Sequence, residues 1–305
     1  MVKKINSSKQ KEIVTHRKRA PFKVFDVVNY TFLTLLTLVF ILPFWSTIVT
    51  SFVSEAERLA RGMFIFYPQN IDLGAYTAVL KPGSQVYSGY IITIIRTFGG
   101  TTCNMLVTVT LAYGMSKKGL PGRTIITFLI YFTMLFSGGL VPTYLVVRHT
   151  GLYNNIGAYI VPGLVSVWNL FLMRNFFMQI PESLEEAAII DGASPLTVLL
   201  RVVLPLSLSS LVTIALFYAV GHWNSWFDGL IYVQKIELLP LQNILRNIII
   251  ASNVENVVDH FSAAPPPLES IKGATIVVST LPILLIYPFA QKYFIKGVMV
   301  GGIKG

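Results

Sequence analysis

Six long apolar stretches dominate the chain after residue 27, and polar segments separate them. The stretches are 28–52, 90–113, 124–147, 155–177, 206–226 and 275–294. Because about 20 helical residues cross the roughly 30 Å of hydrocarbon in a bilayer, each stretch is long enough for a transmembrane helix. The alternating pattern of membrane barrels is absent, and lipid leaves no water to satisfy an open backbone. The pattern predicts an all-α, polytopic membrane protein with six transmembrane helices.

The polar segment 181–205 interrupts this apolar territory and has the pattern of two short helices around a turn. Pro181 suits the first position of a helix, and three glutamates follow where the helix dipole favours anions. These are Glu182, Glu185 and Glu186. Gly192 can adopt the positive φ that ends a helix, so we expect the turn there.

The second helix of this segment is predicted to begin at Ser194 and Pro195, an N-cap followed by a proline at the first helical position. Four apolar residues follow at helical spacing and predict a buried stripe. They are Leu196, Leu199, Leu200 and Val203. Pro205 marks the beginning of the next apolar stretch.

Composition supports a membrane protein and excludes several other classes. Hydrophobic residues make up 53% of the chain, charged residues 12%, and the mean hydropathy is +0.64, whereas soluble domains carry roughly 25% charged residues. The net charge of +10 does not indicate nucleic-acid binding, because the basic residues lie beside the apolar stretches. Cys103 is the single cysteine and the four histidines are scattered, so we expect neither a disulfide within the chain nor a metal site.

The distribution of Lys and Arg predicts the orientation. Residues 1–27 form a basic tail that lacks the apolar core and cleavage site of a signal peptide. Sixteen of the 24 basic residues lie on the side of this tail, of segment 181–205 and of the C-terminus, seven lie on the other side, and Arg96 lies within a stretch. Because cytoplasmic segments are enriched in basic residues, both termini and segment 181–205 are predicted to be cytoplasmic.

Two long connections are expected on the opposite side. The first is 54–88. In the second, Pro240 precedes an amphipathic helix too short to span, followed by an irregular segment around the prolines at 265–267. Its apolar face is predicted to contain Leu241, Ile244, Leu245, Ile248 and Ile249, while Gln242, Asn243, Arg246 and Asn247 face away.

Two groups of aromatic and polar side chains are candidates for a substrate pathway. The first group, near the end of the fifth stretch, is Trp223, Asn224, Trp226 and Asp228. The second group, within the fourth stretch, is Trp168 and Asn169. Aromatic faces combined with hydrogen-bonding groups are suited to sugar rings. An interfacial aromatic belt and helix packing by a polar side chain are the alternatives.

Arg96 and the missing motifs bear on the source of energy. A charge within a span is costly and marks function by default, although snorkelling, or pairing with a carbonyl or with a partner subunit, would also explain it. The chain has no G-x-x-x-x-G-K-[ST] loop for ATP and no series of intramembrane acids typical of a proton-driven carrier. Glu186 has no partner for acid–base catalysis, so the chain is not expected to be an enzyme.

Segment 181–205 resembles the EAA loop of bacterial ABC importer membrane subunits. Six residues match the spacing of that motif, and Val202 stands where it has Ile. The six are Glu186, Ala187, Ala188, Gly192, Leu204 and Pro205. Residues 223–232 and 291–305 are similar to the maltose-type carbohydrate branch, in its subgroup for complex oligosaccharides. The resemblance covers most of the chain after about residue 28.

The resemblance implies a type I ABC importer transmembrane fold, in which this loop is a cytoplasmic coupling helix docked on an ATPase subunit. The residues implied in coupling are Glu185, Glu186, Ala187, Ala188, Asp191 and Gly192. That the acids only stabilise a helix N-terminus is the alternative. The domains implied are a tail at 1–27 and a transmembrane domain at 28–305, with the permease core at about 88–292.

The resemblance also implies an assembly in the bacterial cytoplasmic membrane. Its parts are two ATPase subunits that bind ATP and Mg, a homologous second permease subunit, an extracytoplasmic solute-binding protein and an oligosaccharide substrate moved by alternating access. No cofactor is expected in this chain, whose other contacts would be with membrane lipid and not with nucleic acid. A peptide, amino acid or polyamine as cargo, or a carrier independent of an ATPase, remains the alternative.

Overall fold

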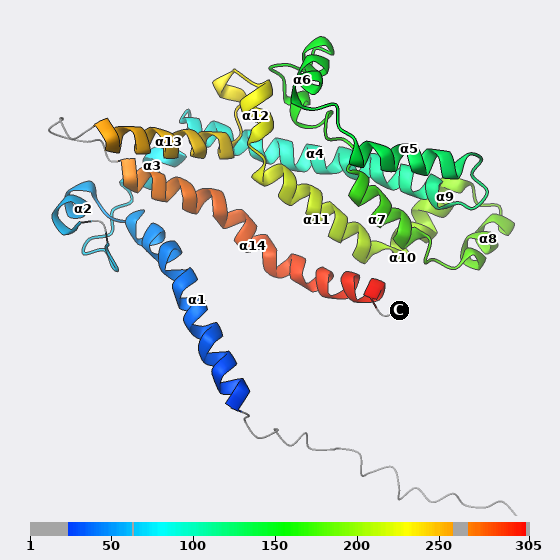
Figure 1. Ribbon diagram of the computed structural model, residues 1–305, viewed down its shortest axis with the longest axis horizontal. Helices are drawn as coiled ribbons and strands as arrows, with labels where there is room; N and C mark the ends of the chain where they lie inside the picture. The colour runs from blue at the N-terminus through cyan, green and yellow to red at the C-terminus, as the bar shows by residue number, and fades with distance from the viewer. Residues whose placement is uncertain (1–23, 63, 259–267, 303–305) are drawn as a thin grey trace, which may run out of the picture. The chain divides into compact units, whose positions relative to one another are not determined.

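A computed structural model describes residues 24–62, 64–258 and 268–302. This part of the chain is built of helices and contains no strand, which confirms the predicted all-α class (Figure 1). The α-helices are α1 (Val24–Thr50), α2 (Glu55–Arg61), α3 (Gly74–Leu80), α4 (Gln85–Ser116), α5 (Arg123–Leu135), α6 (Leu140–His149), α7 (Val167–Phe177), α8 (Glu182–Ile190), α9 (Pro195–Val198), α10 (Leu204–Leu206), α11 (Leu208–Asn224), α12 (Phe227–Tyr232), α13 (Leu241–Val258) and α14 (Leu268–Gly302). The other helical segments are η1 (Ile156–Tyr159) and η3 (Ile236–Leu238), which are 3-10 helices, and η2 (Leu199–Val203), a π-helix.

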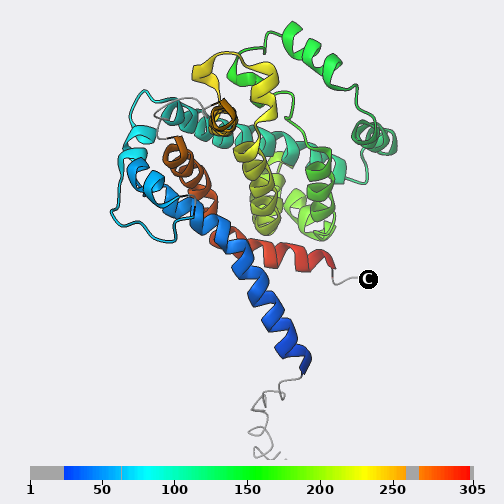
Figure 2. The same cartoon turned by 60° about the vertical axis from the view of Figure 1, so that its left-hand side comes forward.

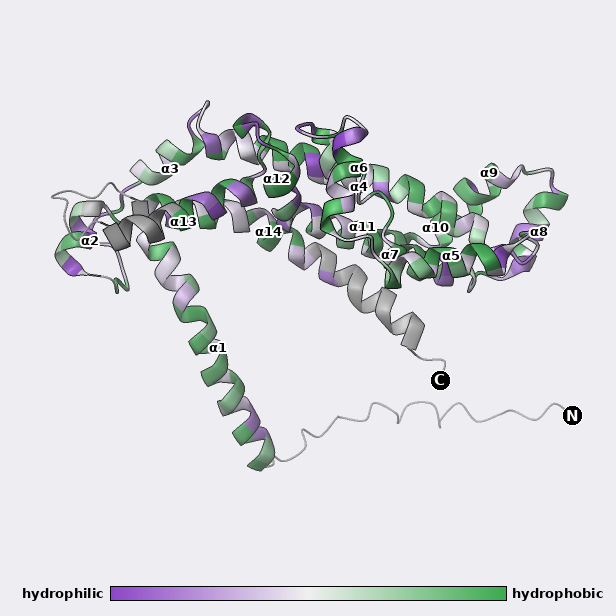
Figure 3. Ribbon diagram, turned by 45° about the horizontal axis from the view of Figure 1, so that its top comes forward, coloured by the Kyte–Doolittle hydropathy of each residue, from purple (hydrophilic) through white to green (hydrophobic). Residues whose placement is uncertain are grey.

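Some predicted segments lie outside the described residues. These are most of the tail 1–27, the prolines at 265–267 and the last residues, 303–305. The chain divides into two compact units, residues 1–46 and 47–305. In the first unit, the helix exposes large apolar side chains along its length, including Phe32, Val39 and Phe44. Most of α1 is hydrophobic in Figure 3. Apolar side chains all round a helix are typical of a membrane span.

The second unit is organised around α4. This helix of 32 residues contacts α7, α11 and α13, and α14 in turn contacts α3, α11 and α13 (Figures 1 and 2). Toward the C-terminal end of α4, Ala112 belongs to a cluster with Leu170 and Val203 in which none of the three is accessible to solvent. Toward its N-terminal end, Val86 packs with Leu241 in a separate cluster. The two ends of α4 therefore carry different packing partners.

One predicted span is bent in the structure, and another makes a sharp angle with the segment before it. Helices α5 and α6 meet at 112° around residues 136–139, and the segments 195–206 and 208–224 meet at 87°. Gly139 has a φ of 88°, which a glycine adopts without a steric penalty and which stops α5 from continuing. By length and composition, two described helices can cross a membrane, Val24–Thr50 and Glu269–Pro288, or up to four segments if each bent pair is one span.

The stretch 155–177 was predicted from its hydropathy to be one transmembrane helix, but it is not one helix in the structure. It consists of η1, a turn through Pro162 and Gly163, and α7. Proline lacks a backbone N–H and clashes with the preceding helical turn, so a helix cannot run through this point undisturbed. The Asn104 side chain donates to the carbonyls of Gly163 and Leu164 at 2.9 and 2.8 Å, which satisfies part of the unwound backbone.

The amphipathic helix after Pro240 is present as α13. Leu241 and Ile244 are buried as predicted, with 0% and 3% of their surface exposed. Asn243, predicted to face away from the core, is instead 4% exposed, and its Nδ2 donates to the carbonyl of Trp226 at 2.8 Å. The prediction was wrong there because a buried amide can replace an apolar side chain when it finds a backbone partner.

Candidate functional site

Segment 181–205 forms the two-helix turn that its sequence predicts. Pro181 is the N-cap of α8, one residue before the predicted position. Gly192 has a φ of 86°, and the N–H groups of Gly192 and Ala193 donate to the carbonyls of Ile189 and Ala188, each at 2.9 Å. These bonds close the helix end and fix the direction of the chain that follows.

The second helix begins as predicted and then departs from α-helical geometry. The Ser194 hydroxyl accepts from the N–H of Thr197, and Pro195 is the first helical residue. The chain then passes through the π-helix η2, whose wider turn changes which side chains face the core. Leu199 and Val203 are buried as expected, whereas Leu196 and Leu200, predicted in the same stripe, are 62% and 53% exposed.

Ion pairs hold α8 against the C-terminal end of α4. Lys117 forms an ion pair with Glu185, which also accepts a hydrogen bond from the Tyr113 hydroxyl at 3.3 Å. Lys118 pairs with Glu182 at 3.0 Å. Glu185 thus faces the chain itself, while Glu186 on the same helix is exposed. A hollow of about 180 Å³ lies between these elements, lined in part by Lys117, Glu186 and Ile189.

The outer surface of α8 is apolar at its C-terminal end. Ile190 is 85% exposed and Ile189 57%, although both are large aliphatic residues. Asp191 and Ala187 are exposed beside them, and Ala188 is half-buried. Hydrophilic and hydrophobic positions therefore lie close together on this short helix (Figure 3). A surface of this kind, carried on a helix that is fixed to α4, is suited to contact with another protein.

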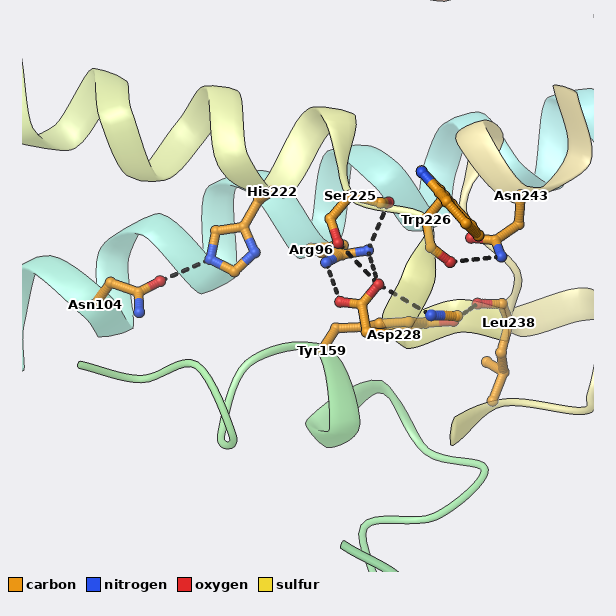
Figure 4. A network of polar contacts seen from close by, with 10 residues as sticks. Arg96, Asn104, Tyr159, His222, Ser225, Trp226, Asp228, Leu238 and Asn243 are labelled. Atoms are coloured by element: carbon orange, nitrogen blue, oxygen red, sulfur yellow. Dashed lines mark hydrogen bonds and ion pairs between the residues drawn. The ribbon is translucent and has the colours of Figure 1, made fainter. Parts of the chain in front are cut away.

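Arg96 is buried in the second unit and is paired with a carboxylate of the same chain. Only 2% of its side chain is exposed. It forms an ion pair with Asp228, and its Nη1 lies 3.2 Å from Asp228 Oδ1 and 3.1 Å from the carbonyl of Ser225 (Figure 4). Its guanidinium carbon lies 4.7 Å from the centre of the Tyr159 ring. The pair joins α4 to the beginning of α12.

Further polar contacts extend along α4 toward its C-terminal end. His222 Nε2 lies 2.6 Å from Asn104 Oδ1 (Figure 4). A Cβ added at Gly100 would lie 2.5 Å from His222 Nε2, so glycine allows α11 to approach here. One turn beyond Asn104, the Thr108 hydroxyl lies 2.8 Å from the hydroxyl of Tyr218, which accepts from the Ser166 N–H.

Five buried polar residues form a stripe along one face of α4, and only Arg96 among them was singled out from the sequence. Its members are Thr93, Arg96, Thr97, Asn104 and Thr108, all buried. They recur at intervals of one, three, four and seven residues, which places them on one face of a helix. That spacing was visible in the sequence, but average hydropathy over the stretch concealed it.

The candidate sugar-binding residues lie in different environments. Trp223 is 8% exposed, and its Nε1 donates to the carbonyl of Ser279 on α14 at 3.0 Å. Asn224 is exposed and donates to its own helix. On α7, Trp168 is 64% exposed and Asn169 6%. Within the described part of the chain, no hydrogen bond or ring contact joins the α7 pair to the group at the end of α11.

Trp226 and Asp228 do lie together. Asp228 belongs to the Arg96 pair described above, and it also accepts hydrogen bonds from the Ser225 hydroxyl and the Gly229 N–H. Trp226 is 39% exposed, and the guanidinium carbon of Arg246 lies 4.8 Å from the centre of its ring. The structure therefore joins these two predicted residues to Arg96 and Arg246, which the sequence had not connected with them.

Comparison with known proteins shows the family. No family model matches the chain. The polygalacturonan/rhamnogalacturonan transport system permease protein YtcP of Bacillus subtilis (strain 168) is 40% identical over 285 residues, covering 93% of this chain and 99% of that protein. The protein LplC of the same organism is 43% identical over 295 residues, covering 96% and 99%. This chain belongs to the carbohydrate ABC transporter permeases.

A solved structure agrees with this assignment. A chain in the crystal structure of a bacterial ABC transporter involved in the import of the acidic polysaccharide alginate is 33% identical. It matches this permease with a TM-score of 0.80 over 90% of this chain and 99% of its own length. Permeases of this family are non-enzymatic membrane components that work with ATPase and binding-protein partners, and a relative from Escherichia coli (strain K12) is an inner-membrane protein.

Proposed function

We propose that segment 181–205 is the cytoplasmic coupling helix through which this permease contacts an ATPase subunit. The observation that carries the proposal is the exposed apolar end of α8, where Ile190 is 85% exposed. The EAA spacing from Glu186 to Pro205 supports it, as does membership of a family that works with ATPases. The coupling residues proposed are Glu185, Glu186, Ala187, Ala188, Asp191 and Gly192.

Coupling in this proposal depends on two connections from α8 into the membrane unit. One is the pair between Glu185 and Lys117 at the end of α4. The other is the turn at Gly192, which leads through η2 to Val203 in the core beside α11. Movement of the ATPase subunits, which hold the ATP and Mg, would displace α8 together with the ends of α4 and α11. Packed elements of this kind transmit displacement because cores do not deform continuously.

The proposed topology has six spans and both termini in the cytoplasm. The tail is 1–27, and its last four residues form the first turn of α1. The membrane domain comprises 28–305, and the permease core is about 88–292. The seven basic residues assigned to the outer side against sixteen on the inner side support this orientation. Bent and interrupted helices are compatible with membrane spans where, as at Asn104, side chains satisfy the freed backbone groups.

The proposed cargo is an oligosaccharide, received from an extracytoplasmic solute-binding protein and moved by alternating access. Two ATPase subunits and a homologous second permease would complete the assembly in the bacterial cytoplasmic membrane. YtcP is named for polygalacturonan and rhamnogalacturonan, and the solved relative belongs to an importer of alginate. Among oligosaccharide importers, the smaller permease of an alginate-oligosaccharide importer is one identity compatible with the family resemblance of the sequence. We therefore favour an acidic oligosaccharide.

ATP hydrolysis by the complex, purified with its ATPase and second permease in lipid, tests the proposal. Binding protein loaded with an acidic oligosaccharide should stimulate hydrolysis by the wild type, and Ile190→Asp should abolish the stimulation. Gly119→Asp is the matched control, since it adds the same carboxylate to the neighbouring turn, where a new Cβ meets no atom within 4 Å. If no ATPase co-purifies, or if both variants behave like the wild type, the coupling proposal is wrong.

A further inference from the structure

Arg246 on α13 is a half-buried cation without an anion among the described residues. It makes no hydrogen bond and no ion pair there, and its contact is with the ring of Trp226. The carboxylate of Asp228, two residues after Trp226, is already paired with Arg96. A cation partly removed from water is stabilised by an anionic partner, and the side chains that the structure describes provide none for Arg246.

The surroundings of Arg246 indicate the chemistry of that partner. Trp226 is 39% exposed and the adjacent Phe227 47%. Their rings meet edge to face at 5.8 Å, which leaves a small aromatic surface beside the guanidinium. A guanidinium binds carboxylates in a bidentate geometry, and an indole packs against the C–H face of a sugar ring. A carboxylate on a sugar would use both groups at once, whereas a lone acidic side chain or a lipid phosphate would use only the guanidinium.

Buried contacts fix the backbone that carries Trp226 and Arg246. Asn243 lies three residues before Arg246 on α13 and donates to the carbonyl of Trp226 (Figure 4). One face of a single helix therefore fixes the loop and carries the guanidinium. The Arg96–Asp228 pair fixes the same loop two residues further on. A binding surface held by buried contacts loses less conformational entropy when a ligand is bound.

The position of these residues suits the receipt of cargo. The 17 residues of α11 separate them from the coupling loop, a length of about 25 Å at the usual helical rise. Helices α12 and α13 follow the C-terminal end of α11, and α13 contacts α4. Trp226 and Arg246 therefore lie toward the N-terminal part of α4, whereas Lys117 and α8 lie at its C-terminal end (Figure 1).

We propose that Trp226 and Arg246 form a contact site for a uronate, a sugar ring that carries a carboxylate. Arg246 donates to the carboxylate while the exposed indole packs on the ring. The site rests on the proposed function, since it assigns to this permease part of the recognition of an acidic oligosaccharide.

Direct binding to the whole complex in nanodiscs of neutral lipid, without the binding protein, tests the site. The probes are trigalacturonate and the same trisaccharide with its carboxyl groups reduced to alcohols. The wild type should bind the acid form more tightly, and Arg246→Gln should weaken only that form, by about tenfold for the loss of a charge-assisted contact. Arg246→Lys should retain most of the preference because it keeps the charge. Trp226→Ala should weaken both forms.

The matched control is Arg148→Gln, which removes an exposed arginine from α6, a helix that contacts α12. It should leave both affinities unchanged. Equal weakening of both trisaccharides by Arg246→Gln, no weakening, or a wild type that binds neither would overturn the proposal. Transport of the same cargo delivered by loaded binding protein is measured in parallel. Transport without an Arg246 effect refutes only this site, whereas no transport by the wild type refutes the proposed function.

Discussion

Breaking the Arg96–Asp228 pair should destabilise the permease more than any surface pair. Asp228→Asn keeps the shape of the side chain but leaves the Arg96 charge, which is 2% exposed, without a counter-ion. Removing one partner of a buried pair typically costs 3 to 5 kcal/mol, and we expect about 3 kcal/mol here because Asp228 is 20% exposed. Arg96→Leu should cost about 2 kcal/mol, since Asp228 retains its bonds from Ser225 and Gly229.

The double variant separates pairing from packing. With both charges removed, the loss should be about 3 kcal/mol instead of the sum of about 5, a coupling of about 2 kcal/mol. The assay is reversible unfolding in mixed detergent micelles, followed by tryptophan fluorescence. The exposed pair Lys118–Glu182, with side chains 75% and 60% exposed, is the control and should show a coupling below about 1 kcal/mol. Additivity at Arg96 and Asp228 within about 0.5 kcal/mol would refute the reasoning.

Three further predictions concern the two ends of the membrane unit. Gly192→Val forces a β-branched residue to a φ of 86°, which should destabilise the fold by about 1–2 kcal/mol and lower cargo-stimulated ATP hydrolysis. The control Gly122→Val, at a φ of 69°, should be strained to a similar degree but keep the stimulation. Equal losses of activity in the two variants would contradict this prediction. Glu185→Gln should loosen α8, measured as faster hydrogen exchange of its amides, whereas Glu186→Gln should leave that exchange unchanged. Faster exchange in Glu186→Gln but not in Glu185→Gln would show that the Lys117–Glu185 ion pair does not hold α8. The backbone N–H of Gln69 lowers the pKa of the Glu57 carboxyl, so the order that this carboxylate gives to its segment is present at neutral pH and lost as the pH falls through that lowered pKa. The protection of the Gln69 amide, corrected for the pH dependence of intrinsic exchange, should therefore fall in acid, and pH-independent protection would refute this.

Features decided by one residue's chemistry were predictable from the sequence. The N-cap at Ser194, the first-turn Pro195 and the positive φ of Gly192 follow from local rules, and each is present. The breaks at Gly139 and Pro162 had the same kind of local signal. Apolar composition summed over 20 residues hid them, because hydropathy measures solvent preference and not whether the helix is continuous.

Long-range pairing was not predictable. Arg96 and Asp228 are 132 residues apart in the sequence, so the partner of the buried arginine depends on how α4 and α12 pack. For the same reason, Glu185 could not be distinguished from Glu186, although one faces α4 and the other solvent. Trp226 was singled out for its chemistry, but only the structure places Arg246 over its ring.

The central claim is that α8 contacts an ATPase on the cytoplasmic side, and site-directed photo-crosslinking tests it most directly. A crosslinking amino acid at Ile190, 85% exposed, should form an adduct with the ATPase subunit in membranes that contain the whole complex. The same amino acid at Ile71, 73% exposed and assigned to the opposite side, should form none. An adduct with the ATPase from position 71, or none from position 190 in an actively transporting complex, would contradict the account.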